Sequence, residues 1–308
     1  MKLNVVSGLL LAALGFGVAA LAVPAPALAQ DTAAQSAVAA PSEASKGKPP
    51  AKAAAVETEE EGVATGIGSH FVTTNTPLVN DQGVFEAVIN HRFDTPVREA
   101  GGQRAFGLDS GASIGLGMEY TFVKNLSVQV YRQSVDADYE FALKGTLVRP
   151  TAALPLALGL RGGIDWETAD YIAEKYSAGF GQLLVSVTLG DRVTLGAAPT
   201  YVSRTPTGGH AWNVPVTVQI KLTNSIAAIG EYIFARRSRN GDPADTKGQW
   251  SFALEKNVYH HKFALVIGNT TATAVNELMA GDFAGSSVTE SNIRLGFNIV
   301  RQFDIATK

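Results

Sequence analysis

The chain has 308 residues, with 25 basic and 28 acidic side chains and a formal net charge of −3. This balance offers no electrostatic footprint for nucleic acid, so we expect no nucleic-acid partner. The absence of cysteine excludes a disulfide framework, cysteine metal ligands and a lipoprotein anchor. The 31 glycines and the mean hydropathy of +0.09 are unusual for a water-soluble enzyme but are typical of a β-barrel.

Residues 1–29 predict a cleaved secretory signal peptide. A single lysine, Lys2, precedes an apolar run, and a small-x-small cleavage site occupies residues 27–29. An uncleaved membrane helix over residues 5–23 is the alternative, because that run is nearly long enough to span a bilayer.

Residues 30–62 predict a disordered linker. They are rich in Ala, Pro, Glu and Lys and contain almost no large apolar side chain, so they cannot offset the entropy lost on ordering. We expect this linker to lie in the periplasm, where it is a candidate for holding a protein partner.

Residues 63–84 form an N-terminal segment before the first predicted strand. Within it, HFVTTNTPLVN (residues 70–80) is polar and looks ordered. We interpret it as a candidate lumen plug, with an extra short strand or a surface loop as the alternatives.

The remainder predicts an all-β fold, a 12-stranded antiparallel up-and-down transmembrane β-barrel over residues 85–303. The stretch WNVPVTVQIKL (residues 212–222) shows the pattern, since apolar and polar residues alternate along it. Most of the predicted strands approach the 9–11 residues that a tilted strand needs to cross a bilayer. They cover residues 85–93, 112–122, 126–134, 139–148, 156–166, 181–189, 193–202, 212–222, 226–234, 250–256, 261–269 and 292–303.

The connections between these strands alternate in length. Most that follow even-numbered strands are short, and most that follow odd-numbered strands are long; residues 135–138 and 149–155 fit this rule poorly. Outer-membrane barrels have short periplasmic turns and long external loops, so an even strand number places both termini in the periplasm.

Aromatic residues gather near both ends of the predicted strands. Two such bands with aliphatic residues between them match the girdles of a membrane barrel. A soluble β-sandwich or a lipocalin-like barrel with an apolar interior is the alternative. We therefore expect the apolar face to contact outer-membrane lipid and the polar face to line a lumen.

The alternation assigns charged side chains of both signs to the lumen in equal numbers, which predicts a weakly selective pore or a lumen closed by ion pairs. For each of them, a purely structural role is the alternative, because charges must avoid lipid. These residues are Glu86, Arg92, Glu119, Glu140, Lys144, Arg161, Asp165, Lys221, Glu231, Glu255, Lys262 and Arg294.

Several motifs resemble a bacterial outer-membrane β-barrel family of unknown function. They are NHRF (90–93), GLDSGAS (107–113), APTYVSR (198–204), HKFALVIGNT (261–270) and NIRLGFNIVRQF (292–303). The resemblance, which includes HFVTTNTPLVN, spans residues 70–303. It implies a barrel in the outer membrane but no activity, so it implies no catalytic or ligand-binding residue.

The last predicted strand also resembles the C-terminal signal that the barrel-insertion machinery recognises, which makes this machinery an expected partner. Two features depart from that signal: Arg301 interrupts the apolar phase, and a C-terminal tail (residues 304–308) follows Phe303.

We considered catalytic and metal chemistry as well. His91 is assigned to the lipid-facing phase and Ser110 lies across the adjacent loop, which raises a lipid hydrolase as a hypothesis. No third group is evident to orient the histidine, so we expect no enzyme activity. His91 and His261 lie at opposite ends of the predicted barrel, and we expect neither a metal site nor a cofactor.

The sequence thus predicts a narrow passive channel, or porin, for small polar solutes. The main alternative is a plugged structural or anchoring barrel whose linker holds a periplasmic partner. An energy-driven uptake barrel would require a wider barrel and a folded plug.

Overall fold

The computed structural model describes residues 68–169, 175–206, 209–234, 248–280 and 292–305. The chain divides into two units, Met1–Glu57 and Thr58–Lys308, and all described residues belong to the second. The predicted signal peptide, the linker and residues 306–308 of the tail lie outside the described residues.

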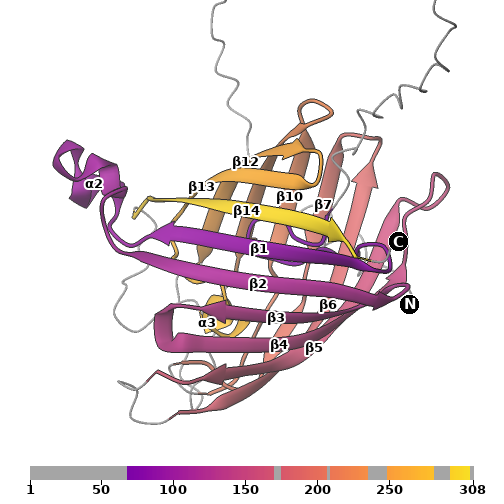
Figure 1. Ribbon diagram of the computed structural model, residues 1–308, viewed down its shortest axis with the longest axis horizontal. Coiled ribbons are helices and arrows are strands. Elements are labelled where there is room, and N and C mark those ends of the chain that lie inside the picture. Colours follow the sequence, from indigo (N-terminus) through magenta and orange to yellow (C-terminus); the bar gives the residue numbers. More distant parts are fainter. Residues whose placement is uncertain (1–67, 170–174, 207–208, 235–247, 281–291, 306–308) are drawn as a thin grey trace, which may run out of the picture. The chain divides into compact units, whose positions relative to one another are not determined.

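The second unit is a closed, all-antiparallel β-barrel (Figure 1). It has twelve strands, two of which are each divided into two segments, so fourteen strand segments are labelled. Its first and last strands, β1 and β14, pair from Val84↔Asp304 to Arg92↔Gly296, and the β5–β6 pairing closes the sheet on the other side. The strand segments are β1 (Val84–Phe93), β2 (Ala112–Val123), β3 (Leu126–Gln133), β4 (Asp138–Val148), β5 (Leu156–Glu167), β6 (Ser177–Leu189), β7 (Val193–Ala197), β8 (Thr200–Val202), β9 (Ala211–Asn213), β10 (Val216–Lys221), β11 (Ile226–Ile233), β12 (Gln249–Val258), β13 (His261–Gly268) and β14 (Arg294–Asp304).

Two of the twelve strands are each interrupted by a proline. Pro199 separates β7 from β8, and Pro215 separates β9 from β10. Proline has no N–H to donate to the ladder, but its carbonyl still accepts. Leu183 donates to Pro199 O at 2.9 Å and Ala198 to Pro215 O at 2.9 Å, so pairing continues across both breaks.

The strands present their apolar side chains outwards. On β9 and β10, the side chains of Trp212, Val218 and Ile220 are exposed, whereas those of Thr217 and Gln219 are buried inside the barrel. A closed barrel satisfies its backbone groups internally, as a lipid environment requires. The apolar face of WNVPVTVQIKL is therefore the outer face.

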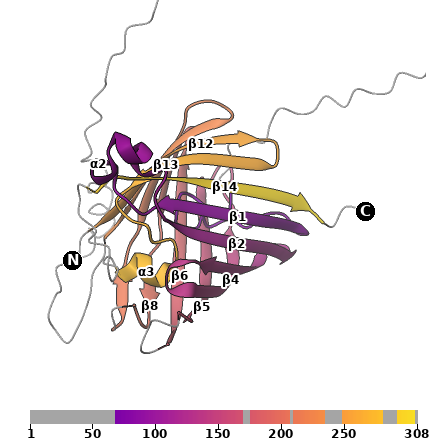
Figure 2. The same ribbon diagram turned by 60° about the vertical axis from the view of Figure 1, so that its left-hand side comes forward.

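The two ends of the barrel differ. One end, here the turn end, carries the start of β1, the end of β14 and short turns such as those between β2 and β3 and between β12 and β13. The other, the loop end, carries longer connections with α2 (Val97–Ala100), η1 (Gly102–Gly107) and α3 (Val275–Ala280). Figure 2 shows α2 and α3 at the same end of the barrel. A third short helix, η2 (Val135–Ala137), joins β3 to β4.

Of the helices in the described ranges, none is long and apolar enough to cross a bilayer.

The predicted strand limits are close to those observed, with one clear correction. The sequence predicts a loop over residues 167–179, but β6 already begins at Ser177. The stretch SAGFG contains two glycines and two other small residues, so its alternation carries little apolar signal. Parts of the long connections, residues 170–174, 207–208, 235–247 and 281–291, lie outside the described residues.

Candidate functional site: the filled lumen

Among the described residues, two segments fold into the lumen, one from each end. The first is the inner hairpin, residues 68–80, which precedes β1. His70 and Asn75 form an antiparallel bridge, and Phe71 N donates to Thr74 O at 2.9 Å, which closes the tip. Thr76 N donates to Ser69 O at 3.0 Å nearer the base.

The tip of the inner hairpin binds the carboxylate of Glu231 on β11. The backbone N–H groups of Val72, Thr73 and Thr74 donate to its oxygens at 2.9, 2.9 and 3.2 Å. The hydroxyls of Thr73 and Thr74 donate to it as well, at 2.5 and 2.7 Å. Five donors from one turn thus surround one wall carboxylate, and hydrogen bonds to a charged acceptor are among the stronger ones.

A second wall carboxylate, Glu86 on β1, binds the base of the inner hairpin. It accepts hydrogen bonds from the Ser69 hydroxyl, from His70 Nδ1 at 3.1 Å and from Asn80 Nδ2 at 3.0 Å. Gln302 on β14 donates to the same carboxylate at 2.8 Å. Glu86 is fully buried, so these contacts replace the water that it would otherwise bind.

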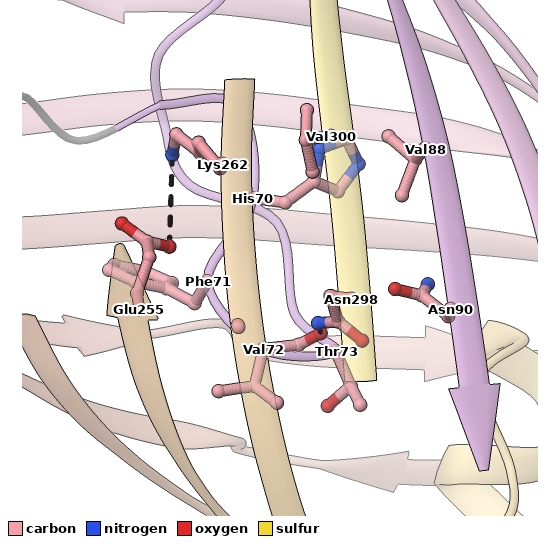
Figure 3. Close-up of a pocket in the computed structure, with 11 residues that line it drawn as sticks. His70, Phe71, Val72, Thr73, Val88, Asn90, Glu255, Lys262, Asn298 and Val300 are labelled. Carbon is pink, nitrogen blue, oxygen red and sulfur yellow. Dashed lines mark hydrogen bonds and ion pairs between the residues drawn. The ribbon is translucent and has the colours of Figure 1, made fainter. Parts of the chain in front are cut away.

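Neutral wall side chains hold the rest of the inner hairpin. Thr146 bonds Pro77 O and Val79 N, each at 2.9 Å, and Asn298 Nδ2 donates to Val72 O at 2.7 Å. Figure 3 shows residues 70–73 beside the inward side chains of β1, β13 and β14. The inner hairpin is therefore bound through polar contacts along its length, and Phe71 and Val72 also pack in a buried apolar cluster with Ile229, Ala253, Ala264 and Val266 of the wall.

The second inserted segment is the capping segment, residues 269–280, which descends from the loop end and includes α3. All twelve of its residues are buried. Gln133 Oε1 on β3 accepts from Thr273 N, Thr273 Oγ1 and Ala274 N at 2.6, 2.7 and 2.7 Å. Gln249 Nε2 donates to Leu278 O at 2.9 Å.

Apolar packing holds the capping segment in place. Val275, Leu278 and Met279 join a buried cluster with side chains from the surrounding wall. The wall side chains of that cluster are Ala142, Tyr176, Ala178, Phe180, Val202, Ala211 and Ile233. The helix α3 contacts β6, β8 and β9, and Figure 1 shows it inside the ring of strands.

Lys144, Arg161 and Lys262 each form an ion pair with a carboxylate of the wall. Lys144 Nζ lies 3.8 Å from Glu119, Arg161 pairs with Glu140, and Lys262 Nζ lies 4.0 Å from Glu255. The last pair is drawn in Figure 3. Lys144 also donates to Ser69 O of the inner hairpin at 2.8 Å, so one of the pairs contacts the inserted segment.

The remaining sequence-assigned lumen residues occupy different surroundings. Arg92 is buried and donates to Asn298 Oδ1 at 2.7 Å, and Asp165 is buried beside Glu140 in the ladder. Arg294 is buried and donates to the carbonyls of Asp94 and Asn269, each at 3.0 Å. Lys221 is only partly buried, at the turn end of β10.

Three further acids are buried inside the barrel besides those assigned from the sequence. In the part of the chain that the structure describes, nine carboxylate side chains are buried but only four cationic ones. The additional acids are Asp138, Glu167 and Glu277. The first two are the first residue of β4 and the last of β5, one position beyond the predicted strands, and Glu277 lies within a predicted loop.

Small cavities lie between the inserted segments and the wall in the described part of the lumen. Two cavities there hold about 20 and 40 Å³. The larger is lined by residues of both segments, including Thr73 and Asn75 of the inner hairpin and Thr273 and Val275 of the capping segment. A water molecule needs roughly 10–15 Å³ measured in this way, so each cavity admits only a few waters.

One group of side chains in the lumen has suitable atoms for a metal ion. His70, Glu86 and Glu119 each offer a ligand atom, and these atoms lie within 4.8 Å of one another. Both carboxylates already accept hydrogen bonds from neutral side chains, and Lys144 neutralises Glu119. The sequence did not suggest this group because His70 is contributed by the inserted segment and not by a strand.

Ser110 and His91, the two residues of the lipid-hydrolase hypothesis, contact other groups in the structure. Ser110 Oγ donates to Gly107 O at 2.6 Å and accepts from Thr95 N at 3.3 Å. The His91 ring stacks on Phe297 with centroids 4.7 Å apart. Within the described ranges no hydrogen bond joins Ser110 to His91.

Comparison with known proteins shows that the chain matches the model of a protein family. The model of a family described as a membrane-bound beta barrel domain (DUF5777) matches residues 68–303, which include both inserted segments. No curated protein sequence matches the chain.

Solved structures with similar folds include an outer-membrane channel, a phospholipase and a porin. The COG4313 outer membrane channel from Pseudomonas putida F1 is 13% identical with a TM-score of 0.46, covering 73% of this chain and 96% of that one. Outer membrane phospholipase A from Escherichia coli is 10% identical with a TM-score of 0.39, at 72% and 90% coverage. OmpF of Salmonella typhi, in complex with daunomycin, is 8% identical with a TM-score of 0.36, at 71% and 97% coverage.

Proposed function

We propose that this chain, which belongs to the membrane-bound beta barrel (DUF5777) family, is an outer-membrane channel for small polar solutes that rests closed. In the closed state the inner hairpin fills the lumen. The passage opens when that hairpin withdraws through the turn end, which faces the periplasm. This orientation follows from the lengths of the connections and from the predicted signal peptide.

The binding of the hairpin tip to Glu231 is the observation that carries the proposal. The tip is held by hydrogen bonds that water can replace, and a hydrogen bond exchanged with water contributes only about 0.5–1.5 kcal/mol, or about 1.5–3 kcal/mol when one group is charged. Withdrawal exposes the apolar cluster around Phe71 and Val72, and elsewhere it uncovers a wall of polar side chains such as Glu86, Thr146 and Glu231. A hydrated passage needs such a wall.

The test compares the full-length chain with two variants at Thr74. Thr74→Asp places a carboxylate against Glu231, and the repulsion should expel the hairpin while leaving the wall unchanged. Thr74→Asn is the matched control, because it has nearly the same size and no charge. In planar bilayers we expect rare openings from the wild type and from Thr74→Asn, and frequent openings from Thr74→Asp.

A closed structural or anchoring barrel is the second candidate, and the filled lumen is what favours it. It predicts no current from any of the three proteins, although each should still show the heat-dependent gel mobility of a folded barrel. Current of equal frequency from the wild type and Thr74→Asp would instead show that the hairpin does not control the passage.

A further inference from the structure

We infer that the opened barrel prefers cations, so that its solutes are small inorganic cations or amines. This inference rests on the proposed function, because it concerns the wall that the inner hairpin leaves behind. Two observations carry it: the excess of acids inside the barrel, and the way in which two of those acids are neutralised.

The excess is clear in the described part of the lumen. Nine carboxylate side chains are buried against four cationic ones, and the half-buried Lys221, Lys262 and Arg204 raise the cationic number to seven. The acids also occur at different heights, from Glu86 near the turn end to Asp138 and Glu167 at the loop end. A lumen with an excess of one sign along its length attracts the opposite ion.

The second observation is the difference between two kinds of wall carboxylate. Glu119, Glu140 and Glu255 pair with wall cations that remain when the hairpin leaves. Glu86 and Glu231 have no lysine or arginine within 4.0 Å in the described residues, and their main donors belong to the hairpin.

Withdrawal therefore removes most of the donors from Glu86 and Glu231 but none of the wall cations from the other three acids. Gln302 still donates a hydrogen bond to Glu86, and Ser251 still donates one to Glu231 at 3.4 Å. Each of the two carboxylates therefore keeps one hydrogen bond from the wall. The net effect of opening is to present two carboxylates to the passage. A cation entering the lumen replaces the charge-stabilising contacts that the hairpin provided.

Arg92 is the strongest opposing charge, because it is buried in the same wall and is not ion-paired in the described residues. Its Nη1 is directed to Asn298 Oδ1 and to the carbonyls of His91 and Phe297, at 2.7, 3.0 and 3.3 Å. It is thus fixed against β14 and offsets one of the two carboxylates. Lys144 interacts electrostatically with Glu86 but is ion-paired with Glu119, so its charge is shared between two carboxylates.

The test measures reversal potentials in a potassium chloride gradient, using full-length Thr74→Asp as the opened protein. We expect a potential of the sign that potassium preference gives. Adding Glu86→Gln and Glu231→Gln should shift the potential toward zero, whereas adding Asp109→Asn, on an exposed loop, should leave it unchanged. Because Glu231→Gln also removes the repulsion that expels the hairpin, Glu86→Gln is measured alone as well.

The outcomes separate this inference from the proposed function. Absence of current from Thr74→Asp would overturn the channel and the inference together. Current without ion preference, or with chloride preference, would overturn the inference and leave the channel. Potassium preference that does not change in either glutamate variant would show that these two carboxylates do not determine it, and would overturn their assignment.

Discussion

The two segments that fill the lumen are held by different balances of polar and apolar contacts. The inner hairpin buries Phe71 and Val72 against the wall, but most of its contacts are polar. The inner hairpin is bound through hydrogen bonds to wall side chains, with Glu231 as the main acceptor. The capping segment has a similar but uncharged acceptor in Gln133, and it also buries Val275, Leu278 and Met279 in an apolar cluster. Apolar burial contributes about 25 cal/mol per Å² and is lost on exposure, whereas polar contacts are largely replaced by water. The hairpin is accordingly the part suited to move.

The largest expected effect follows from removing the charged acceptor of the hairpin. Glu231→Leu leaves three backbone N–H groups at the tip without their partner, at a cost of about 1–3 kcal/mol for each one that stays buried. The hairpin should therefore spend much more time withdrawn, and bilayer recordings should show more frequent openings. Unchanged opening frequency, in a protein that still migrates as a folded barrel, would contradict the role of Glu231.

The capping segment should respond to loss of apolar contact instead. Leu278→Ala should weaken its attachment by about 2–5 kcal/mol, as for other buried leucines. Hydrogen exchange of residues 275–280 should accelerate, while the opening frequency changes little because the hairpin still fills the lumen. Leu265→Ala, on the outer face and 72% exposed, is the control and should leave that exchange unchanged. Equal effects of the two substitutions would refute the apolar anchoring of α3.

A smaller effect is expected from the uncharged acceptor. Gln133→Leu removes the partner of Thr273 N and Ala274 N and the amide that donates to the Glu277 carboxylate, but it leaves the apolar cluster intact. Exchange at these two amides should rise while the amides of α3 stay protected. If α3 lost protection to the same extent as in Leu278→Ala, the capping segment would depend on its polar contacts as the hairpin does.

The smallest expected effect is a pH dependence at Tyr176, which precedes β6. Burial, and then its hydrogen bond to Glu167, raise the pKa of the Tyr176 phenol above its ordinary value. The folded protein therefore keeps this proton when the unfolded chain loses it, above about pH 10, and stability falls as pH rises further. Tyr176→Phe should reduce the alkaline fall in the temperature of the gel-mobility transition. An identical fall in the variant would assign it to other groups.

Much of the fold could be predicted from the sequence because a barrel strand carries its own signal. Alternation needs only local information, so WNVPVTVQIKL identified both a strand and its outer face. The predicted strand limits were wrong where the apolar alternation is weak. The small residues of SAGFG concealed the start of β6, and Asp138 and Glu167 lay one residue outside the predicted strands.

The candidate site was harder to predict from the sequence because it depends on contacts between residues that are distant along the chain. Residues 70–80 stood out as a polar, ordered-looking segment, but nothing local connects Thr73 to Glu231, 158 positions away. The capping segment lay within a predicted loop, since α3 spans only six residues and gives little periodicity. Glu277 was missed for the same reason, because it enters the lumen only through that loop.

The most direct test of the central claim is to fix the hairpin to the wall. The hydroxyls of Thr74 and Thr217 lie 3.3 Å apart, and the chain has no cysteine of its own, so Thr74→Cys with Thr217→Cys introduces one defined disulfide. Bilayer conductance is then recorded before and after reduction of the same protein. We predict silence while the disulfide is intact and repeated openings after reduction, since the Thr74 bond to Glu231 is also lost. The same current in both states would show that ions pass without movement of the hairpin, and would contradict the account.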